Sequence, residues 1–180
     1  MATIKNQVII GVMGGGRAEP RHTEMAYRLG HLIAAEGWVL LNGGRRAGIM
    51  DASARGAREK GGVTVGILPD ADDRHLSPHI LIPILTGMGS GRNYINALSS
   101  HVMVACPGGA GTLSEIALAL KHDRPVILLD MDVGDMFSAY VANGQLKKVA
   151  TAVDAIEAIK SYLKNKTFID SPGMDSGLAT

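Results

Sequence analysis

The sequence predicts one domain of the α/β class, an open parallel sheet with helices on both faces. Short runs rich in Val, Ile and Leu recur along the chain, and each is apolar throughout, which is typical of strands buried on both faces. Segments long enough for a helix separate most of these runs, and such alternation gives a parallel sheet. The 180 residues, 46% of them hydrophobic, are enough for one ordinary core.

Six apolar runs supply the expected strands. They are Val8–Met13, Trp38–Leu41, Val63–Leu68, Ile80–Leu85, Val102–Cys106 and Val126–Leu129. The expected helices are Pro20–Glu36, Gly48–Lys60, Arg92–Ser99, Thr112–His122 and Val153–Lys164. Pro83 weakens the fourth run as a strand, because proline cannot donate a hydrogen bond to a sheet. The segment Pro69–His79 is too short for a crossover helix, so we expect a loop there.

The expected domain spans residues 1–165. The stretch Asn165–Thr180 is rich in Gly, Ser, Asp and Thr and has no hydrophobic period, so residues 166–180 are expected to form a flexible tail. No apolar run approaches the roughly 20 residues that a membrane helix needs. We therefore expect a soluble protein with no membrane partner.

Composition excludes several classes of partner. The 18 Lys and Arg residues nearly balance the 17 Asp and Glu residues, so no global field attracts nucleic acid, and any anion site must be local. The single cysteine, Cys106, excludes an internal disulfide, and the first residues do not look like a secretory signal, which favours the cytoplasm. Cys106 ends a buried strand without a paired histidine, so it is expected to be a core thiol rather than a nucleophile.

Histidine spacing gives little support for a metal site. Only His75 and His79 have the spacing of a ligand pair, and they lie near Asp72 and Asp73. An i, i+4 pair faces one metal only on a helix, and this segment is expected to be a loop. The sequence therefore predicts no structural metal.

Four glycine clusters directly follow expected strands. They are Gly14–Gly16, Gly43–Gly44, Gly87–Gly89 around Met88, and Gly108–Gly109. The loops after parallel strands form one rim, and ligands bind at that rim where the strand order switches. Glycine gives tight turns and lets the backbone approach an oxyanion. Turn chemistry alone explains any one cluster, but four on one rim predict a ligand site.

The loop Pro107–Thr112 carries the sharpest signal. Its glycines turn the chain out of a strand and into a helix, whose free N–H groups and dipole attract an anion. No Gly-Lys-Ser/Thr follows, and the first loop lacks the spacing of a dinucleotide site. We therefore expect the phosphate of a mononucleotide-sized ligand at Pro107, Gly108, Gly109, Ala110, Gly111 and Thr112.

Charged residues near this loop each have two interpretations. Glu115 either completes a capping box with Thr112 or faces the ligand, where it would bind sugar hydroxyls or stabilise positive charge during glycosidic cleavage. Arg92 is either its cationic partner or an exposed helix arginine. Arg45 and Arg46 are either solvated or supply one phosphate contact.

The segment Pro107–Glu115 resembles the signature Pro-Gly-Gly-x-Gly-Thr-x-x-Glu of the Lonely Guy superfamily. The resemblance extends over most of residues 7–130, with Gly43–Met50 in place of the family's Gly-Gly-Gly-x-x-Gly-Leu-Met. In the members that activate cytokinins, an arginine and the signature glutamate cleave the N-glycosidic bond of a nucleoside 5′-monophosphate. The resemblance implies those catalytic roles for Arg92 and Glu115 if this chain is a hydrolase.

One departure favours a carrier over a hydrolase. The hydrolases read Met-His-x-Arg-Lys around the arginine, whereas this chain has Arg92-Asn93 preceded by Gly89-Ser90-Gly91. That form is similar to the molybdenum cofactor carrier branch, which holds molybdopterin in the same cleft. The resemblance therefore implies molybdenum cofactor as bound cargo, a homo-oligomer (dimer or tetramer), and molybdoenzymes as recipients. A phosphoribohydrolase and a nucleotide sensor stay as alternatives.

The residues expected to bind the cofactor come from the four glycine clusters and from the residues that follow them. They are Gly14, Gly15, Gly44, Arg45, Gly89, Arg92, Asn93, Pro107, Gly108, Gly109, Ala110, Gly111, Thr112 and Glu115.

Overall fold

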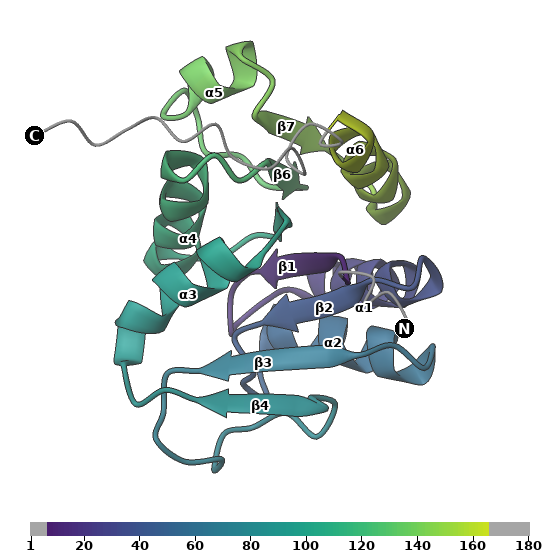
Figure 1. Cartoon of the computed structure of the whole chain (residues 1–180), viewed down its shortest axis with the longest axis vertical. Helices are drawn as coiled ribbons and strands as arrows, with labels where there is room; N and C mark the ends of the chain where they lie inside the picture. Colours follow the sequence, from purple (N-terminus) through teal and green to yellow (C-terminus); the bar gives the residue numbers. More distant parts are fainter. Residues whose placement is uncertain (1–6, 166–180) are drawn as a thin grey trace, which may run out of the picture.

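The computed structural model describes residues 7–165 and confirms a single α/β domain built on a seven-stranded parallel sheet (Figure 1). The strands are β1 (Ile9–Met13), β2 (Val39–Asn42), β3 (Thr64–Leu68), β4 (Ile82–Leu85), β5 (Val102–Ala105), β6 (Val126–Leu129) and β7 (Leu146–Val149). The helices are α1 (Pro20–Ala35), α2 (Gly48–Glu59), α3 (Arg92–Ser99), α4 (Ala110–Lys121), α5 (Ser138–Ala142) and α6 (Ala152–Asn165), with a 3₁₀ turn, η1, at Gly89–Gly91.

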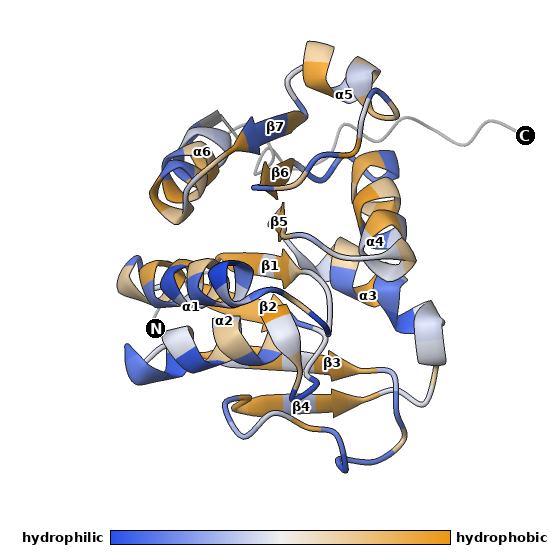
Figure 2. Cartoon of the chain, turned by 180° about the vertical axis from the view of Figure 1, so that it is seen from behind, coloured by the Kyte–Doolittle hydropathy of each residue, from blue (hydrophilic) through white to orange (hydrophobic). Residues whose placement is uncertain are grey.

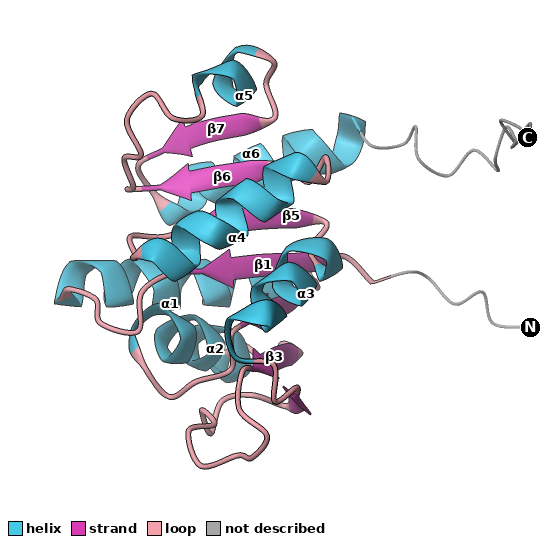
Figure 3. Cartoon of the chain, turned by 90° about the vertical axis from the view of Figure 1, so that its left-hand side faces the viewer, coloured by secondary structure: helices cyan, strands magenta, loops and turns pink. Residues whose placement is uncertain are grey.

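Two hydrophobic cores lie on the two faces of the sheet. On one face, strand residues such as Ile10 and Leu40 pack with Leu29 and Ile33 of α1 and with residues of α2 and α6. On the other face, a second cluster joins the sheet to α3 and α4. Figure 3 shows α3 and α4 crossing the sheet on the side that faces the viewer. The prediction of helices on both faces is therefore confirmed.

The strand order β4-β3-β2-β1-β5-β6-β7 fixes where a ligand can enter. Strands β1 to β4 lie side by side in chain order, and β5 then pairs with the other side of β1, with Ile10 in register with Val102. The loops after β1 and β5 consequently leave in opposite directions and open a crevice at the carboxyl ends of these strands. Those two loops hold the first and the last of the glycine clusters.

The edge strand β4 explains how a proline fits into the sheet. Pro83 pairs in register with Gly66 of β3, and β4 has no second neighbour, so the missing N–H leaves no ladder position empty. The expected loop at residues 69–79 is confirmed, since that segment forms bends and turns. Figure 2 shows β4 as an apolar edge strand with no helix drawn across it.

Helices α1 and α2 cross at a closely packed glycine contact. A Cβ at Gly30 would overlap the backbone carbonyl of Ser53, and one at Gly56 would overlap that of Tyr27. The two backbones therefore approach each other more closely than side chains would allow. Within residues 7–165, no helix is long and apolar enough to cross a membrane.

Three elements differ from the sequence-based expectation. Strand β7 and helix α5 were not expected, because β7 reads Leu-Lys-Lys-Val and α5 has only five residues. Helix α4 begins at Ala110, two residues before the expected start at Thr112. The tail expected at residues 166–180 lies outside the described residues.

Candidate functional site

A cleft of about 220 Å³ opens at the carboxyl ends of β1 and β5. Its walls come from the loops after β1, β2 and β5 and from the starts of α3 and α4. The lining residues are Val12, Met13, Gly14, Gly15, Gly16, Gly43, Met50, Arg92, Asn93, Gly109, Gly111, Thr112 and Glu115. The cleft thus lies where the strand order switches, as expected for a ligand site in this class of fold.

The start of α4 forms an uncapped floor to this cleft. Gly109 is the N-cap residue, and no side chain caps the helix, so the first N–H groups have no partner within the helix. A Cβ at Gly109 or Gly111 would meet no atom within 4 Å, which shows that the backbone here faces open space. Thr112, only 4% exposed, adds a hydroxyl group beside these N–H groups. Together they form a surface on which an anion can bind.

The capping box considered from the sequence is wrong. Helix α4 starts too early for Thr112 to be its N-cap, and the Glu115 carboxylate accepts a hydrogen bond from the Asn96 amide instead, at 2.8 Å. Glu115 therefore points away from the helix start and contributes to the wall of the cleft.

Backbone contact between two loops requires glycine. The Gly15 N–H donates to the Pro107 carbonyl at 3.0 Å, and a Cβ at Gly108 would overlap the Thr112 hydroxyl and lie 2.9 Å from the Gly15 nitrogen. A Cβ at Gly14 would lie 2.7 Å from Ile49. Only glycine permits this approach, which brings the loops after β1 and β5 together.

Arg92 and Glu115 form a buried ion pair in the wall of the cleft. Arg92 Nη1 lies 3.6 Å from Glu115 Oε1, and the two side chains are 12% and 7% exposed. The alternative of an exposed helix arginine is therefore wrong. Gly43 makes room for this arginine, because a Cβ there would lie 2.5 Å from Arg92 Nη1.

Burial acts against both charges of this pair. It raises the pKa of Glu115, and the hydrogen bond from Asn96 and the charge of Arg92 only partly oppose that rise. Burial also lowers the pKa of Arg92, while the Glu115 carboxylate opposes this change. Two buried polar atoms, Arg92 Nε and Asn96 Oδ1, have no hydrogen-bond partner. Buried polar groups normally have partners, and of these two residues Arg92 lines the cleft.

Asn93 joins the two helices that flank the cleft. Its amide Nδ2 donates to the Ser114 hydroxyl at 2.8 Å and lies 3.4 Å from the Gly111 carbonyl. Asn93 thereby fixes α3 against the first turn of α4.

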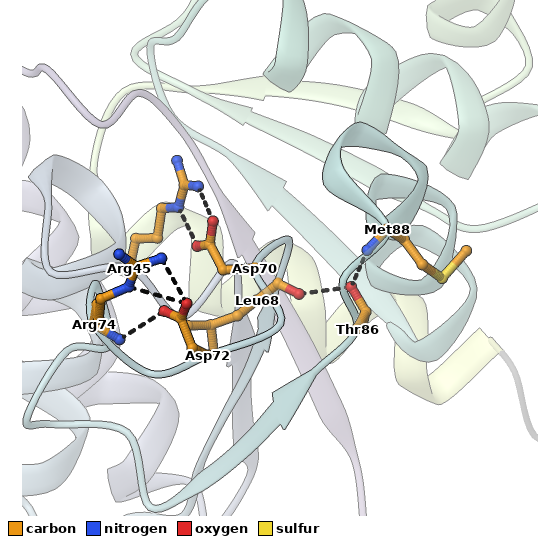
Figure 4. Close-up of polar contacts among 7 residues, drawn as sticks. All are labelled: Arg45, Leu68, Asp70, Asp72, Arg74, Thr86 and Met88. Carbon is orange, nitrogen blue, oxygen red and sulfur yellow. Dashed lines mark hydrogen bonds and ion pairs between the residues drawn. The ribbon is translucent and has the colours of Figure 1, made fainter.

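Six residues expected at the site lie outside the cleft lining: Gly44, Arg45, Gly89, Pro107, Gly108 and Ala110. Arg45 forms a two-point ion pair with Asp70, with distances of 3.0 and 2.7 Å, and Figure 4 shows it turned toward that carboxylate. The Gly44 N–H donates to the Asn42 side chain at 2.8 Å. Gly89 is exposed in η1.

The segment that carries Gly89 is attached to β3 by Thr86. The Thr86 hydroxyl donates to the Leu68 carbonyl at 2.7 Å and accepts from the Met88 N–H at 3.2 Å (Figure 4). Arg45 stays electrostatically coupled to the cleft, because its charge helps to lower the pKa of Arg92.

Some lining residues were not among the predicted ligand contacts. Gly16 and Gly43 belong to glycine clusters already noted, so the signal was present, whereas Val12, Met13 and Met50 look like ordinary core residues in the sequence. Cys106 is fully buried, and burial raises the pKa of its thiol to about 12. The prediction of a core thiol is confirmed.

Comparisons with known proteins agree with this geometry. The model of the SLOG cluster4 family matches residues 7–159. The molybdenum cofactor binding protein of the phototrophic bacterium Rippkaea orientalis is 48% identical, with a TM-score of 0.83 over 88% of this chain and 98% of that one. The Chlamydomonas reinhardtii molybdenum cofactor carrier protein is 42% identical, with a TM-score of 0.81 over 88% of this chain and 99% of that one.

A second kind of relative is named as an enzyme. A protein of Mycobacterium tuberculosis, named cytokinin riboside 5′-monophosphate phosphoribohydrolase, is 36% identical over 124 residues. The match covers 63% of this chain and 66% of the mycobacterial protein, just under two thirds of its length.

Proposed function

Because the chain belongs to the SLOG cluster4 family, we propose that it carries molybdenum cofactor, binding it without a covalent bond and releasing it intact. The observation that carries this proposal is the likeness, along almost their whole length, to two proteins described as binding or carrying that cofactor. The cleft lies within residues 7–159, which the family model matches.

The phosphate of the cofactor is proposed to bind at the start of α4. Its uncapped N–H groups, the open backbone at Gly109 and Gly111, and the Thr112 hydroxyl support this position. The dipole contributes about 0.3–1 kcal/mol per contact and up to ~2 kcal/mol when the anion is partly buried. The gain is local, which suits a chain whose net charge is only +1.

The pterin ring is proposed to lie against the wall formed by Arg92 and Glu115. A pterin carries an amino group and a ring N–H side by side, and a carboxylate can accept a hydrogen bond from each. Glu115 is the one acidic residue in the described lining. The ring also presents carbonyl and ring-nitrogen acceptors, which suit the unpartnered Arg92 Nε. Binding would thus give the Arg92 Nε–H a hydrogen-bond acceptor.

Retention and transfer of the cofactor test the proposal directly. The purified protein is mixed with molybdenum cofactor without oxygen, passed through gel filtration, and then mixed with a cofactor-free molybdoenzyme. We expect about one cofactor per chain to be retained and the recipient to become active. Loss of the cofactor on the column, with recipient activity no higher than in a control without this protein, would refute the carrier function.

A phosphoribohydrolase is the second candidate, favoured by the Arg92–Glu115 pair and by the mycobacterial relative. The raised pKa of Glu115 suits proton transfer to a leaving base. The test is release of free base from several nucleoside monophosphates by the wild type and by Glu115→Gln, which keeps shape but removes the charge. Turnover of about 1 per second or faster, lost in the variant, would favour the enzyme over the carrier.

We also propose that the protein is a homo-oligomer in the cytoplasm. Each residue of β4 is exposed, and Leu81, Ile82, Ile84, Leu85 and Met88 are 43–55% exposed, so a large apolar edge faces outward. Such an edge invites pairing with another chain, and a second copy covers it symmetrically. Light scattering after gel filtration tests this, with Ile84→Lys expected to dissociate the assembly; a wild-type monomer would contradict it.

A further inference from the structure

A second hollow, of about 430 Å³, lies next to the cleft. The two share Gly15, Gly16 and Gly109, so they meet at the point where the loops after β1 and β5 touch. The remaining lining residues of the second hollow are Arg17, Ala18, Glu19, His22, Pro107 and Gly108. A phosphate at the start of α4 would lie between the two spaces, and a ligand wider than a nucleotide could enter both.

His22 lines this hollow, and one of its two ring nitrogens is buried without a hydrogen bond. The residue is 7% exposed, and its Nε2 atom is buried without a hydrogen-bond partner. Asp130 Oδ2 lies 3.3 Å from that nitrogen, but the contact does not have the geometry of a hydrogen bond. Because a native protein rarely leaves a buried polar atom unsatisfied, this nitrogen indicates a missing partner.

The charges around the hollow favour an anionic partner. Arg17 and His22 both line it, and the helices α1 and α4 begin at its border, each with the positive end of its dipole. Of the nearby carboxylates, Glu19 is paired with Arg21 at 3.0 Å. Asp130 is 40% exposed, and its Oδ2 atom lies 3.5 Å from Arg21 Nη1 as well as close to His22.

We propose that the second hollow is a separate anion subsite, which receives the oxygen-bearing metal end of the cofactor while α4 holds the phosphate. This inference rests on the proposed carrier function. In molybdopterin the phosphate and the sulfur pair that holds the metal are attached to one ring, and the pterin extends from the other side of that ring. A phosphate placed between the two hollows therefore leaves the pterin for the cleft and the metal oxygens for the His22 side.

The subsite gives the chain a means of selecting its cargo. A nucleoside monophosphate has a base for the cleft and a phosphate for α4 but no group for the second hollow. Metal-free molybdopterin likewise leaves His22 without a partner. The hollow thus favours the finished, metal-bearing cofactor over both, since only that ligand offers acceptor oxygens to the buried ring nitrogen.

The experiment compares the affinities for metal-free molybdopterin and for the metal-bearing cofactor, titrated without oxygen. We expect the wild type to bind the metal-bearing form at least tenfold more tightly and His22→Leu to lose that preference, with metal-free binding changed by less than about twofold. His31→Leu, at a partly exposed position further along α1, is the matched control and keeps the preference. His22→Gln, which retains an N–H donor, is expected to recover part of it and serves if the leucine variant does not fold.

The outcomes separate this inference from the proposed function. A wild type that binds both forms equally, or a preference that survives in both His22 variants, overturns the subsite and leaves the carrier function standing. Equal weakening of both forms in His22→Leu also overturns it, because His22 would then act only through the fold. If the wild type binds neither form, the carrier function and the subsite fail together.

Discussion

Replacing Gly111 with alanine should make the protein more stable and less able to bind its ligand. Gly111 lies in the first turn of α4 with no atom within 4 Å of an added Cβ, and its φ is not positive. Glycine to alanine in a helix gains about 0.5–1 kcal/mol, and each kcal/mol raises the Tm of a domain of this size by roughly 2–4 °C. We therefore expect a Tm increase of up to about 4 °C.

The same methyl group should weaken phosphate binding. A helical Cα–Cβ bond tilts toward the N-terminus, so the added methyl leans toward the place where an anion would meet the N–H groups. We expect at least a tenfold loss of cofactor affinity, equal to about 1.4 kcal/mol, measured by titration without oxygen. Gly91→Ala is the matched control, since its backbone is also helical and its added Cβ would make only ordinary contacts with Met88. Equal affinity in the two variants would refute the assignment of the phosphate to α4.

Three further predictions concern stability, each measured by equilibrium urea unfolding. The pKa of Glu115 is higher in the folded protein than its ordinary 4.5. The contribution of this carboxyl group to the free energy of unfolding is therefore complete below pH 4.5 and is lost as pH rises through the folded-state pKa. Glu115→Gln should gain stability relative to the wild type from pH 4 to 8, and a constant difference would contradict this. Asn42→Leu should lower the free energy of unfolding by about 2–3 kcal/mol, because the buried Asn42 side chain forms hydrogen bonds with Met50, Ser53 and Gly44. A loss below about 1 kcal/mol would show that these hydrogen bonds contribute little to stability. Gly30→Ala should lower the free energy of unfolding by about 3 kcal/mol or more, since the methyl group would overlap a backbone carbonyl of α2. An unchanged urea midpoint would mean that α1 and α2 can move apart without cost.

Strands that are apolar throughout were the part of the fold that the sequence predicted well. Each of the six expected runs overlaps a strand, and in five of them burial on both faces accounts for the continuous apolar signal, whereas β4 is an exposed edge strand. Strand β7 is the exception, since Lys147 and Lys148 interrupt it at the outer edge of the sheet, where one side faces solvent. An edge strand of four residues with two lysines has no pattern that distinguishes it from a loop.

The candidate site was predictable where backbone chemistry determines it and unpredictable where side-chain packing does. Glycines after strands identify the loops at Gly14 and Gly109, because close backbone approach excludes other residues. The ion pair of Arg45 with Asp70 joins residues 25 positions apart, and no local sequence pattern predicts it. His22 likewise looks like an ordinary surface residue near a helix start until the fold brings it beside Asp130.

The Arg92–Glu115 pair suits both a carrier and a hydrolase, and the chemistry of the ligand decides between them. At 3.6 Å and an effective dielectric constant of 20, the attraction is about 5 kcal/mol, yet removing each ion from water costs several kcal/mol. The pKa of Glu115 is raised because burial outweighs both the hydrogen bond from Asn96 and the attraction of Arg92. A ligand that donates to Glu115 or accepts from Arg92 therefore relieves an existing cost. Molybdopterin has no N-glycosidic bond between its ring system and its phosphate, so the pair that would cleave a nucleotide can hold this cargo without breaking it.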